Sequence, residues 1–297
     1  FINHKITETL DGDGVEVKID IFEGKKFTVE RINIIGNSVT NDSVIRGEFI
    51  IDEGDPFSAL LVNKSINRLK ARGIFGKVEH KVTEGSLPDL KVLEISIEEK
   101  ATGEISAGAG VGTDGTSFMA AVSENNWLGR GIKLQSSLNL TQDSISGGID
   151  VTNPNFNYTG NSVSAALDVS STDKTTSSGY ESKKTGLGLG TEFEQYQNIY
   201  LSPAISAQIG TKEINSVGYQ YFLDSKKDAI DPNKSTYIRF SQNYSTSNSN
   251  FSHIRSTALV KQSRNILRDE VSVSAAFEFG HLSQIEGKSR VTDRFTT

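Results

Sequence analysis

Four histidines, at positions 4, 80, 253 and 281, are the side chains of this 297-residue chain best suited to bind a metal or to transfer a proton at neutral pH. Their positions share no metal-ligand spacing, so we interpret them as surface or strand-edge residues and expect no metal site. The chain contains no cysteine, which excludes disulfides, thiolate metal sites and cysteine nucleophiles.

The other patterns that could do chemistry are equally weak. The acidic run Asp52–Asp55 suits a solvated turn better than an acid–base pair. The glycines of Gly108–Gly112 lack the Gly-Lys-Ser/Thr ending of a phosphate loop. No serine, histidine and aspartate stand in an order with a geometric rationale for a triad. We therefore expect neither an enzymatic activity nor a cofactor.

Charge and hydropathy constrain the class of protein. The net charge of −6 argues against a general nucleic-acid binder. No apolar run approaches the roughly 18–20 residues of a membrane-spanning helix. Residues 1–100 hold 32 of the 68 charged side chains, and the rest of the chain is rich in Ser, Thr, Asn and Gly. This change of composition predicts a domain boundary near Lys100–Gly103.

The first hundred residues mix strand and helix signals. Period-two alternation predicts strands at Val15–Ile21 and Phe27–Ile35. A short helix is expected after Asn41 or Asp42, and a longer one from Pro56 to a stop at Gly73. A hairpin of two further strands, around 78–82 and 90–97, completes a β-α-α-β-β order over residues 27–99.

The second part alternates nearly throughout, in about ten segments between residues 104 and 282. Ile132, Leu134, Leu138 and Leu140, for example, occupy one face of a strand, and polar residues occupy the other. Segments of roughly 8–12 residues match membrane-spanning strands and exceed ordinary soluble ones. The opposite face carries small polar residues, as expected for the lumen of a barrel.

Connections and aromatic residues support the same interpretation. We expect the stretches 113–116, 170–184 and 211–235 on one side of the barrel, and shorter turns on the other. Two of the short turns are predicted to place aromatic side chains at the membrane interface; the aromatic and turn residues are Trp127, Gly129, Gly131, Pro154 and Phe156. For Trp127, a glycine-aided turn that the aromatic ring fills is the alternative. A soluble β-sandwich with an adhesive role, attached to an α/β module, is the alternative.

Several motifs, in their order along the chain, resemble a known family. Residues 27–100 resemble a polypeptide-transport-associated (POTRA) domain, through Val29–Asn37, Thr40–Arg46, Glu53–Asp55, Arg68–Val78 and Ile97–Gly103. The following segments resemble the first barrel strands of the BamA family of bacterial outer-membrane assembly factors, through Gly110–Gly115, Glu124–Gly131 and Val151–Phe156. Arg290–Phe295 resembles the run before the large inward-folded loop of that family, and the sequence stops there.

The resemblance implies an α+β POTRA domain followed by an antiparallel transmembrane β-barrel that is truncated before its last strands. Residues 1–24 would be the tail of a preceding POTRA domain, residues 25–100 the POTRA domain adjoining the barrel, and residues 101–297 the N-terminal portion of the barrel. The barrel would lie in the outer membrane of a Gram-negative bacterium, with the POTRA domain in the periplasm.

The function implied is the assembly and insertion of outer-membrane β-barrel proteins. A weak seam at the first barrel strand would pair with an unfolded client through its backbone, at Glu104, Ile105, Ser106, Ala107, Gly108, Ala109, Gly110, Val111 and Gly112. The POTRA domain would dock clients or accessory lipoproteins at an edge strand that contains Phe75, Lys77, Val78, Glu79, His80 and Val82. Its alternative role is that of a spacer.

The partners expected from the resemblance are unfolded barrel clients, accessory assembly lipoproteins and the lipid bilayer, with no nucleic acid. A second branch of the superfamily, which exports a partner polypeptide through the pore, is the main alternative function. Protein import into an organelle, by other members of the same superfamily, is a further alternative function.

Overall fold

The structure of the chain is a computed structural model that describes residues 2–11, 14–23, 26–112, 115–176, 179–211, 213–225, 234–247, 251–266 and 271–287. The chain divides into two compact units, Phe1–Ala101 and Thr102–Thr297. The predicted motif Arg290–Phe295 lies outside the described residues.

The chain begins with a two-stranded antiparallel hairpin of β1 (Ile2–Asp11) and β2 (Gly14–Glu23). Ile6 lies opposite Ile19, and Val17 shares their face, so one face of the hairpin is apolar and exposed. The assignment of residues 1–24 to a preceding POTRA domain stays a prediction.

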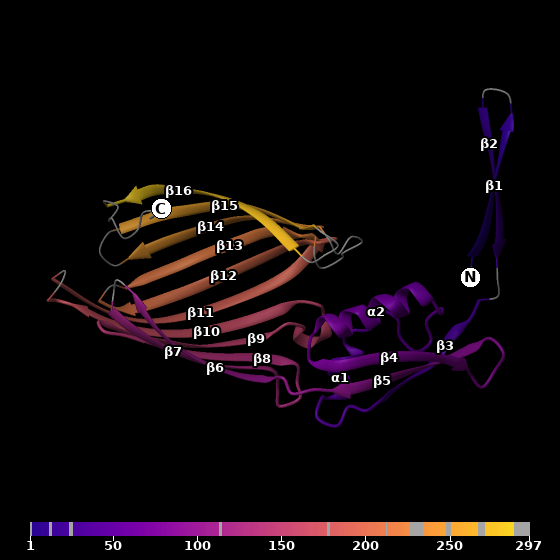
Figure 1. The fold of residues 1–297 in the computed structure, drawn as a ribbon, viewed down its shortest axis with the longest axis horizontal. Coiled ribbons are helices and arrows are strands. Elements are labelled where there is room, and N and C mark those ends of the chain that lie inside the picture. The colour runs from indigo at the N-terminus through magenta and orange to yellow at the C-terminus, as the bar shows by residue number, and fades with distance from the viewer. Residues whose placement is uncertain are drawn as a thin grey trace. The chain divides into compact units, whose positions relative to one another are not determined.

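Residues 28–99 form a three-stranded sheet with the spatial order β3–β5–β4. β3 (Thr28–Ile35) runs parallel to β5 (Leu90–Glu99), and β4 (Phe75–Glu84) runs antiparallel to β5. The helices α1 (Asp42–Arg46) and α2 (Ala59–Ala71) precede β4, and α2 lies across one face of the sheet (Figure 1). The predicted order β-α-α-β-β is thus confirmed.

One hydrophobic core holds this sheet and its helices together. It contains Ile45 from α1, Val62 and Leu69 from α2, and Leu93 and Ile95 from the central strand β5, each 1 % exposed or less. Every member of the core cluster lies between positions 29 and 97. The domain therefore has a core of its own.

The ends of the helices agree with the sequence in part. Asn41 is the N-cap of α1, and Gly73, with φ +68°, directly follows the C-cap of α2. The predicted start of the second helix at Pro56 is wrong. Ser58 is the N-cap and accepts a hydrogen bond from the Leu61 amide (3.4 Å), whereas Pro56 forms an isolated bridge with Thr28.

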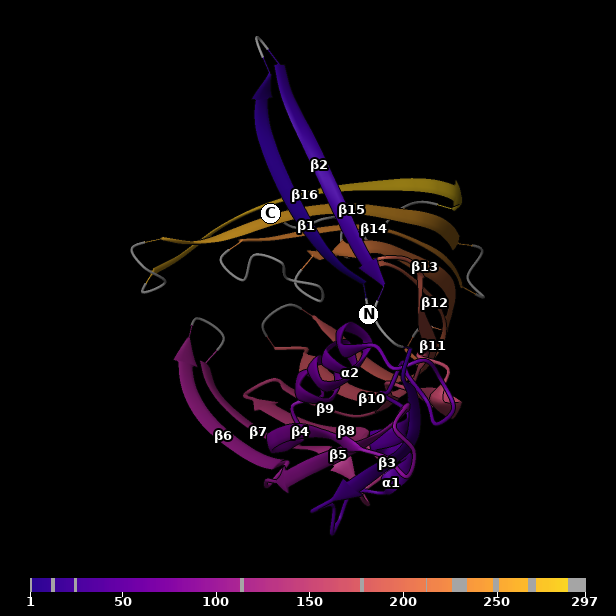
Figure 2. The ribbon, with the colours of Figure 1, turned by 90° about the vertical axis from the view of Figure 1, so that its right-hand side faces the viewer.

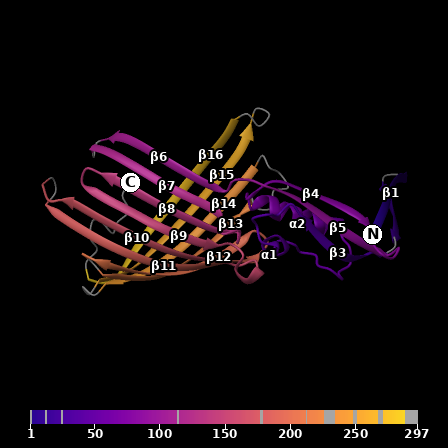
Figure 3. The same ribbon diagram turned by 90° about the horizontal axis from the view of Figure 1, so that it is seen from below.

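The described residues from 103 to 286 form a single 11-stranded sheet in which sequential strands are antiparallel neighbours (Figures 1 and 2). Its strands are β6 (Gly103–Gly112), β7 (Gly115–Trp127), β8 (Ile132–Thr141), β9 (Ser144–Asn153), β10 (Ser162–Lys174), β11 (Tyr180–Tyr196), β12 (Ile199–Gly210), β13 (Ile214–Asp224), β14 (Lys234–Ser247), β15 (Phe251–Ile266) and β16 (Val271–Glu286). The sheet curves strongly, and β6–β8 cross β14–β16 obliquely in projection (Figure 3). Tilt and curvature of this kind are needed to close a sheet into a barrel.

Two predicted connections are wrong. The stretch 170–184, expected as a loop, is mostly strand, since the end of β10 up to Lys174 pairs with the start of β11 from Tyr180. The stretch 211–235, expected as a single long loop, contains β13, which pairs with β12 and β14. Val217, Tyr219 and Tyr221 share one face of it, and Gly218 and Gln220 lie between them on the other face. Polar residues on both sides of this strand, Thr211–Glu213 before it and Ser225–Asp228 after it, made the whole stretch resemble a loop.

Candidate functional site

The predicted pairing edge is a single strand at the border of the large sheet. Among the described strands, β6 is paired on one side only, by β7, from Gly103 opposite Glu124 to Gly112 opposite Gly115. All ten residues of β6 are exposed. An unpaired strand border presents a row of N–H and C=O groups that can template another strand.

The two faces of β6 differ in what they offer. Ile105, Ala107, Ala109 and Val111 share the apolar face of the neighbouring strands, since Ala109 lies opposite Phe118. Val111 is 87 % exposed. On the other face, the second half of β6 carries Gly108, Gly110 and Gly112. These residues have no side chains to form cross-strand pairs with β7.

The apolar face of the whole sheet is uncovered. Within the described part of Thr102–Thr297, the buried apolar side chains are Phe222 and Phe251, whereas Leu138 is 45 % exposed and similar side chains follow on every strand from β6 to β16. A soluble sandwich must bury one face of each sheet against another sheet. The single continuous sheet therefore excludes the β-sandwich alternative.

The predicted aromatic turns lie at the end of the sheet where β6 begins. Trp127 closes β7, and the turn after it places Gly129 and Gly131 at φ +69° and +65°. Phe156, two residues after Pro154, opens the short 3-10 helix η1 (Phe156–Tyr158) between β9 and β10. Trp127 and Phe156 are both largely exposed. Their placement suits an interfacial belt, which stays a prediction.

The structure shows a hydrogen-bonded cluster at the start of β6 that the sequence did not predict. The Glu124 carboxylate accepts hydrogen bonds from the Thr102 hydroxyl and from the Asn126 amide (2.7 Å). The buried Asn126 Oδ1 accepts a hydrogen bond from the Gly131 amide (2.7 Å). The sequence indicated only a glycine-rich turn here, because register across two strands is needed to bring Thr102 to Glu124.

The predicted POTRA edge, β4, borders the three-stranded sheet. Phe75 and Val78 enter the core, whereas Lys77, Glu79 and His80 are exposed and Val82 is 38 % exposed. Lys77 and Glu79 form an ion pair of 2.8 Å, which raises the pKa of Lys77. Within residues 26–112, all of which are described, β5 is the only strand partner of β4.

The opposite border, β3, is capped by the acidic turn. The Val29 amide donates to the Asp55 carbonyl (2.9 Å), and the Gly54 amide donates to the Val29 carbonyl (2.7 Å). The Ile32 amide donates to Glu53 Oε1 (2.9 Å). The run 52–55, interpreted from sequence as a solvated turn, thus occupies three backbone groups of the first half of β3, and β4 is the less obstructed edge.

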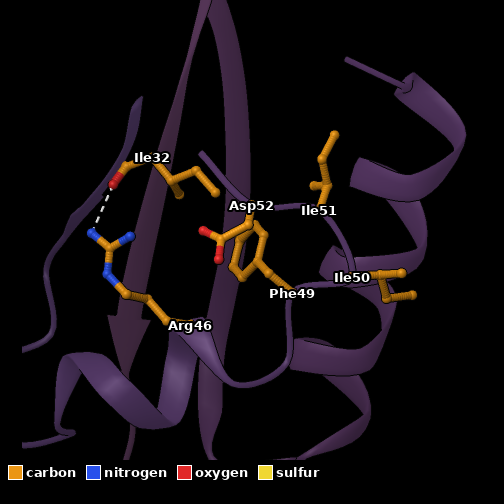
Figure 4. A pocket seen from close by; sticks show the side chains of 6 residues that line it. All are labelled: Ile32, Arg46, Phe49, Ile50, Ile51 and Asp52. Carbon is orange, nitrogen blue, oxygen red and sulfur yellow. Dashed lines mark hydrogen bonds between the residues drawn. The ribbon is translucent and has the colours of Figure 1, made fainter. Parts of the chain in front are cut away.

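A shallow cavity of about 270 Å³ lies beside this capped border (Figure 4). It is lined by Ile32, Arg46, Phe49, Ile50, Ile51 and Asp52. Arg46 Nη2 donates to the Ile32 carbonyl (2.9 Å), and Arg46 also pairs with Asp42 and Glu53, which raise its pKa. The cavity thus offers apolar surface beside a guanidinium already held in place.

The described residues contain no group of three or more His, Asp or Glu side chains placed to hold a metal ion. Across the same described residues, no helix is both long and apolar enough to cross a membrane.

Comparison with known proteins identifies the domain of the three-stranded sheet. Residues 27–100 match the POTRA family model, described as a surface antigen variable number repeat. The outer membrane protein assembly factor BamA of Neorickettsia risticii is 25 % identical over 258 residues, which cover 79 % of this chain and 34 % of the relative. The assembly factor BamA of Neisseria meningitidis is 31 % identical over 157 residues, 52 % of this chain and 19 % of the relative. The chain thus spans about a third or less of the length of these relatives.

Solved structures share the fold. The crystal structure of BamA from Haemophilus ducreyi lacking POTRA domains 1–3 matches with a TM-score of 0.63 at 18 % identity, covering 94 % of this chain and 60 % of the other. CdiB from Escherichia coli matches with a TM-score of 0.59 at 14 % identity, covering 94 % and 58 %. In both, the likeness extends across the POTRA domain and the large sheet.

Proposed function

We propose that this BamA-like chain is the POTRA domain and the N-terminal barrel strands of a factor that inserts β-barrel proteins into the bacterial outer membrane. Residues 1–24 belong to a preceding POTRA domain, residues 25–100 to the periplasmic domain next to the barrel, and residues 101–297 to the barrel itself. The observation that carries the proposal is an exposed, glycine-rich edge strand, β6, directly after a POTRA domain.

The physical basis of the activity is backbone pairing. A client strand cannot enter lipid with unpaired N–H and C=O groups, because each costs several kcal/mol in hydrocarbon. The free border of β6 satisfies one side of an incoming strand, and burial of the client's apolar face in lipid supplies the free energy. The proposed process therefore needs neither a cofactor nor a catalytic side chain.

The POTRA domain contributes a second pairing edge. Because Glu53 and Asp55 occupy the border of β3, strand addition takes place at β4, where clients or accessory lipoproteins dock. The contrasting role is a spacer that only positions the barrel. A proline in the exposed part of β4 that leaves client binding unchanged would support the spacer.

Membrane insertion is tested with a matched pair of labels on β8. This chain contains no cysteine, so we would introduce Leu138→Cys or Asn139→Cys into the complete protein, with any cysteine outside this chain replaced by serine, attach a fluorophore and quench it with nitroxide lipids. The two side chains are neighbours on opposite faces of one strand. Strong quenching at 138 and little at 139 is expected; equal quenching at both would contradict a lipid-facing strand.

Client pairing is tested by disulfide capture in vesicles. Ala109→Cys on β6 and Ala165→Cys on β10 are matched, since both alanines are exposed and lie on the apolar face. A barrel client with a cysteine in its terminal strand should be captured at 109 and not at 165. Equal capture at the two positions, or none, contradicts the insertion function.

The fold likeness to CdiB favours one other function, export of a polypeptide through the pore. The curated relatives are named assembly factors, which favours insertion. Release of a polypeptide into the vesicle lumen, without capture at position 109, would support export.

A further inference from the structure

The two halves of β6 are held by different kinds of contact. We call the end of β6 that begins at Gly103 its root and the end at Gly108–Gly112 its tip. At the root, the Thr102 carbonyl accepts hydrogen bonds from the Asn125 amide and from Asn125 Nδ2, both at 3.3 Å. The Thr102 hydroxyl donates to Glu124 Oε1, which also accepts from the Asn126 amide at 2.7 Å. These contacts add side-chain anchors to the strand ladder.

The root cluster is itself fixed by the turn between β7 and β8. Asn126 is 7 % exposed, and its carbonyl and Oδ1 accept hydrogen bonds from the amides of Gly129 (2.9 Å) and Gly131 (2.7 Å). Both glycines have positive φ, which other residues adopt only with strain. The turn therefore fixes Asn126, and the Asn126 amide holds the Glu124 carboxylate in one position.

Among the described residues, no comparable set of side-chain hydrogen bonds anchors the tip of β6, Gly108–Gly112. Gly108, Gly110 and Gly112 lie opposite Met119, Ser117 and Gly115. On this face, therefore, β6 contributes no side chain to the contacts with β7. The Ser117 hydroxyl reaches the Gly110 carbonyl at 3.4 Å, which is a long hydrogen bond. Glycine also gains the most backbone freedom when a ladder opens.

From this contrast we infer that Thr102, Glu124 and Asn126 form a fixed pivot at the root of β6. The tip half, Gly108–Gly112, separates from β7 to meet an incoming strand, while the root stays paired. Glu124 is a positioning residue in this step. The inference rests on the proposed insertion function and adds which part of the strand moves.

The movement is tested with two cysteine pairs that lock β6 to β7. Ile105→Cys with Val122→Cys locks the root, and Ala109→Cys with Phe118→Cys locks the tip; both pairs are directly opposite on the same face. The tip lock should slow client insertion about tenfold or more, reversibly on reduction, and the root lock less than about twofold. Equal slowing by both locks, or by neither, overturns the pivot.

The anchor is tested without any client by amide hydrogen exchange of the complete protein in vesicles. Root amides of 104–106 should exchange about tenfold more slowly than tip amides of 108–112. Glu124→Ala should erase this gradient, whereas Glu124→Gln should keep it because its amide oxygen still accepts. Amides of the central strand β10 serve as the folding control.

The two measurements separate the two proposals. A uniform exchange rate along β6 overturns the pivot, even if capture at position 109 succeeds. A failed capture overturns the insertion function, and an exchange gradient that depends on Glu124 still supports the anchored root.

Discussion

Replacing Glu99 by glutamine should destabilise the POTRA domain in a pH-dependent way. The Glu99 carboxylate, at the end of β5, accepts hydrogen bonds from the Ser38 amide (2.9 Å) and hydroxyl (2.7 Å), the Val39 amide (2.9 Å) and the Thr40 amide (2.6 Å). A glutamine turns an NH₂ group toward one set of these donors. At least one backbone N–H of the 38–40 loop then loses its acceptor.

The size of the effect follows from the pKa of Glu99. Burial alone would raise this pKa, but the hydrogen bonds from Thr40, Ser38 and Val39 lower it from the ordinary 4.5 to about 2. At 1.36 kcal/mol for each pH unit, this difference sets an upper bound of about 3 kcal/mol. Solvent screens a partly exposed carboxylate, so we expect a loss of about 1.5–2 kcal/mol at pH 7.

The sign of the pH dependence is fixed by linkage. Since the pKa is lower in the folded than in the unfolded state, the stabilisation by Glu99 is complete above about pH 4.5 and is lost as the pH falls toward about 2. The difference in stability between the parent and Glu99→Gln should therefore shrink by more than half between pH 7 and pH 2.5.

The assay is urea unfolding of residues 26–101, followed by circular dichroism at the two pH values. This segment contains the whole core cluster of the domain. Glu98→Gln, at the exposed neighbouring position, is the control and should change stability by less than about 0.5 kcal/mol. A loss that is the same at both pH values, or one below about 0.5 kcal/mol at pH 7, would refute the reasoning.

Three further changes in the same domain have defined outcomes in the same unfolding assay. Leu93→Ala, at a fully buried position of the central strand, should cost about 2–5 kcal/mol; a cost below 1 kcal/mol would mean that the site collapses without a cavity. Ser65→Ala removes the hydroxyl that accepts from the Ile50 amide (2.9 Å) and should cost about 1–3 kcal/mol, with an exposed Ser86→Ala change as the control. Gly36→Ala should cost more than about 2 kcal/mol, because φ is +92° and the added Cβ would clash with the Ile97 carbonyl oxygen; an unchanged midpoint would contradict this backbone geometry.

Much of the fold could be predicted from local patterns. Side chains alternate between the two faces of a strand, so the period-two segments from residue 104 onward identified the strands of an antiparallel sheet without any contact information. Gly73 marked a helix end because its positive φ is a local property, whereas Asn41 is the N-cap of α1 without a capping hydrogen bond from its side chain. The pattern failed between 211 and 235, where polar residues flank β13 and hide its boundaries.

What the sequence by itself determined is therefore the kind of elements, their order, and long strands with one apolar face, since these depend on neighbours along the chain. Only the tertiary structure decided which strand borders are free. Glu53 reaches Ile32 across 21 positions and closes β3, and Thr102 meets Glu124 across 22. The physical reason is that hydrogen bonds between distant residues exist only once strand order and register are set, and no local propensity encodes them.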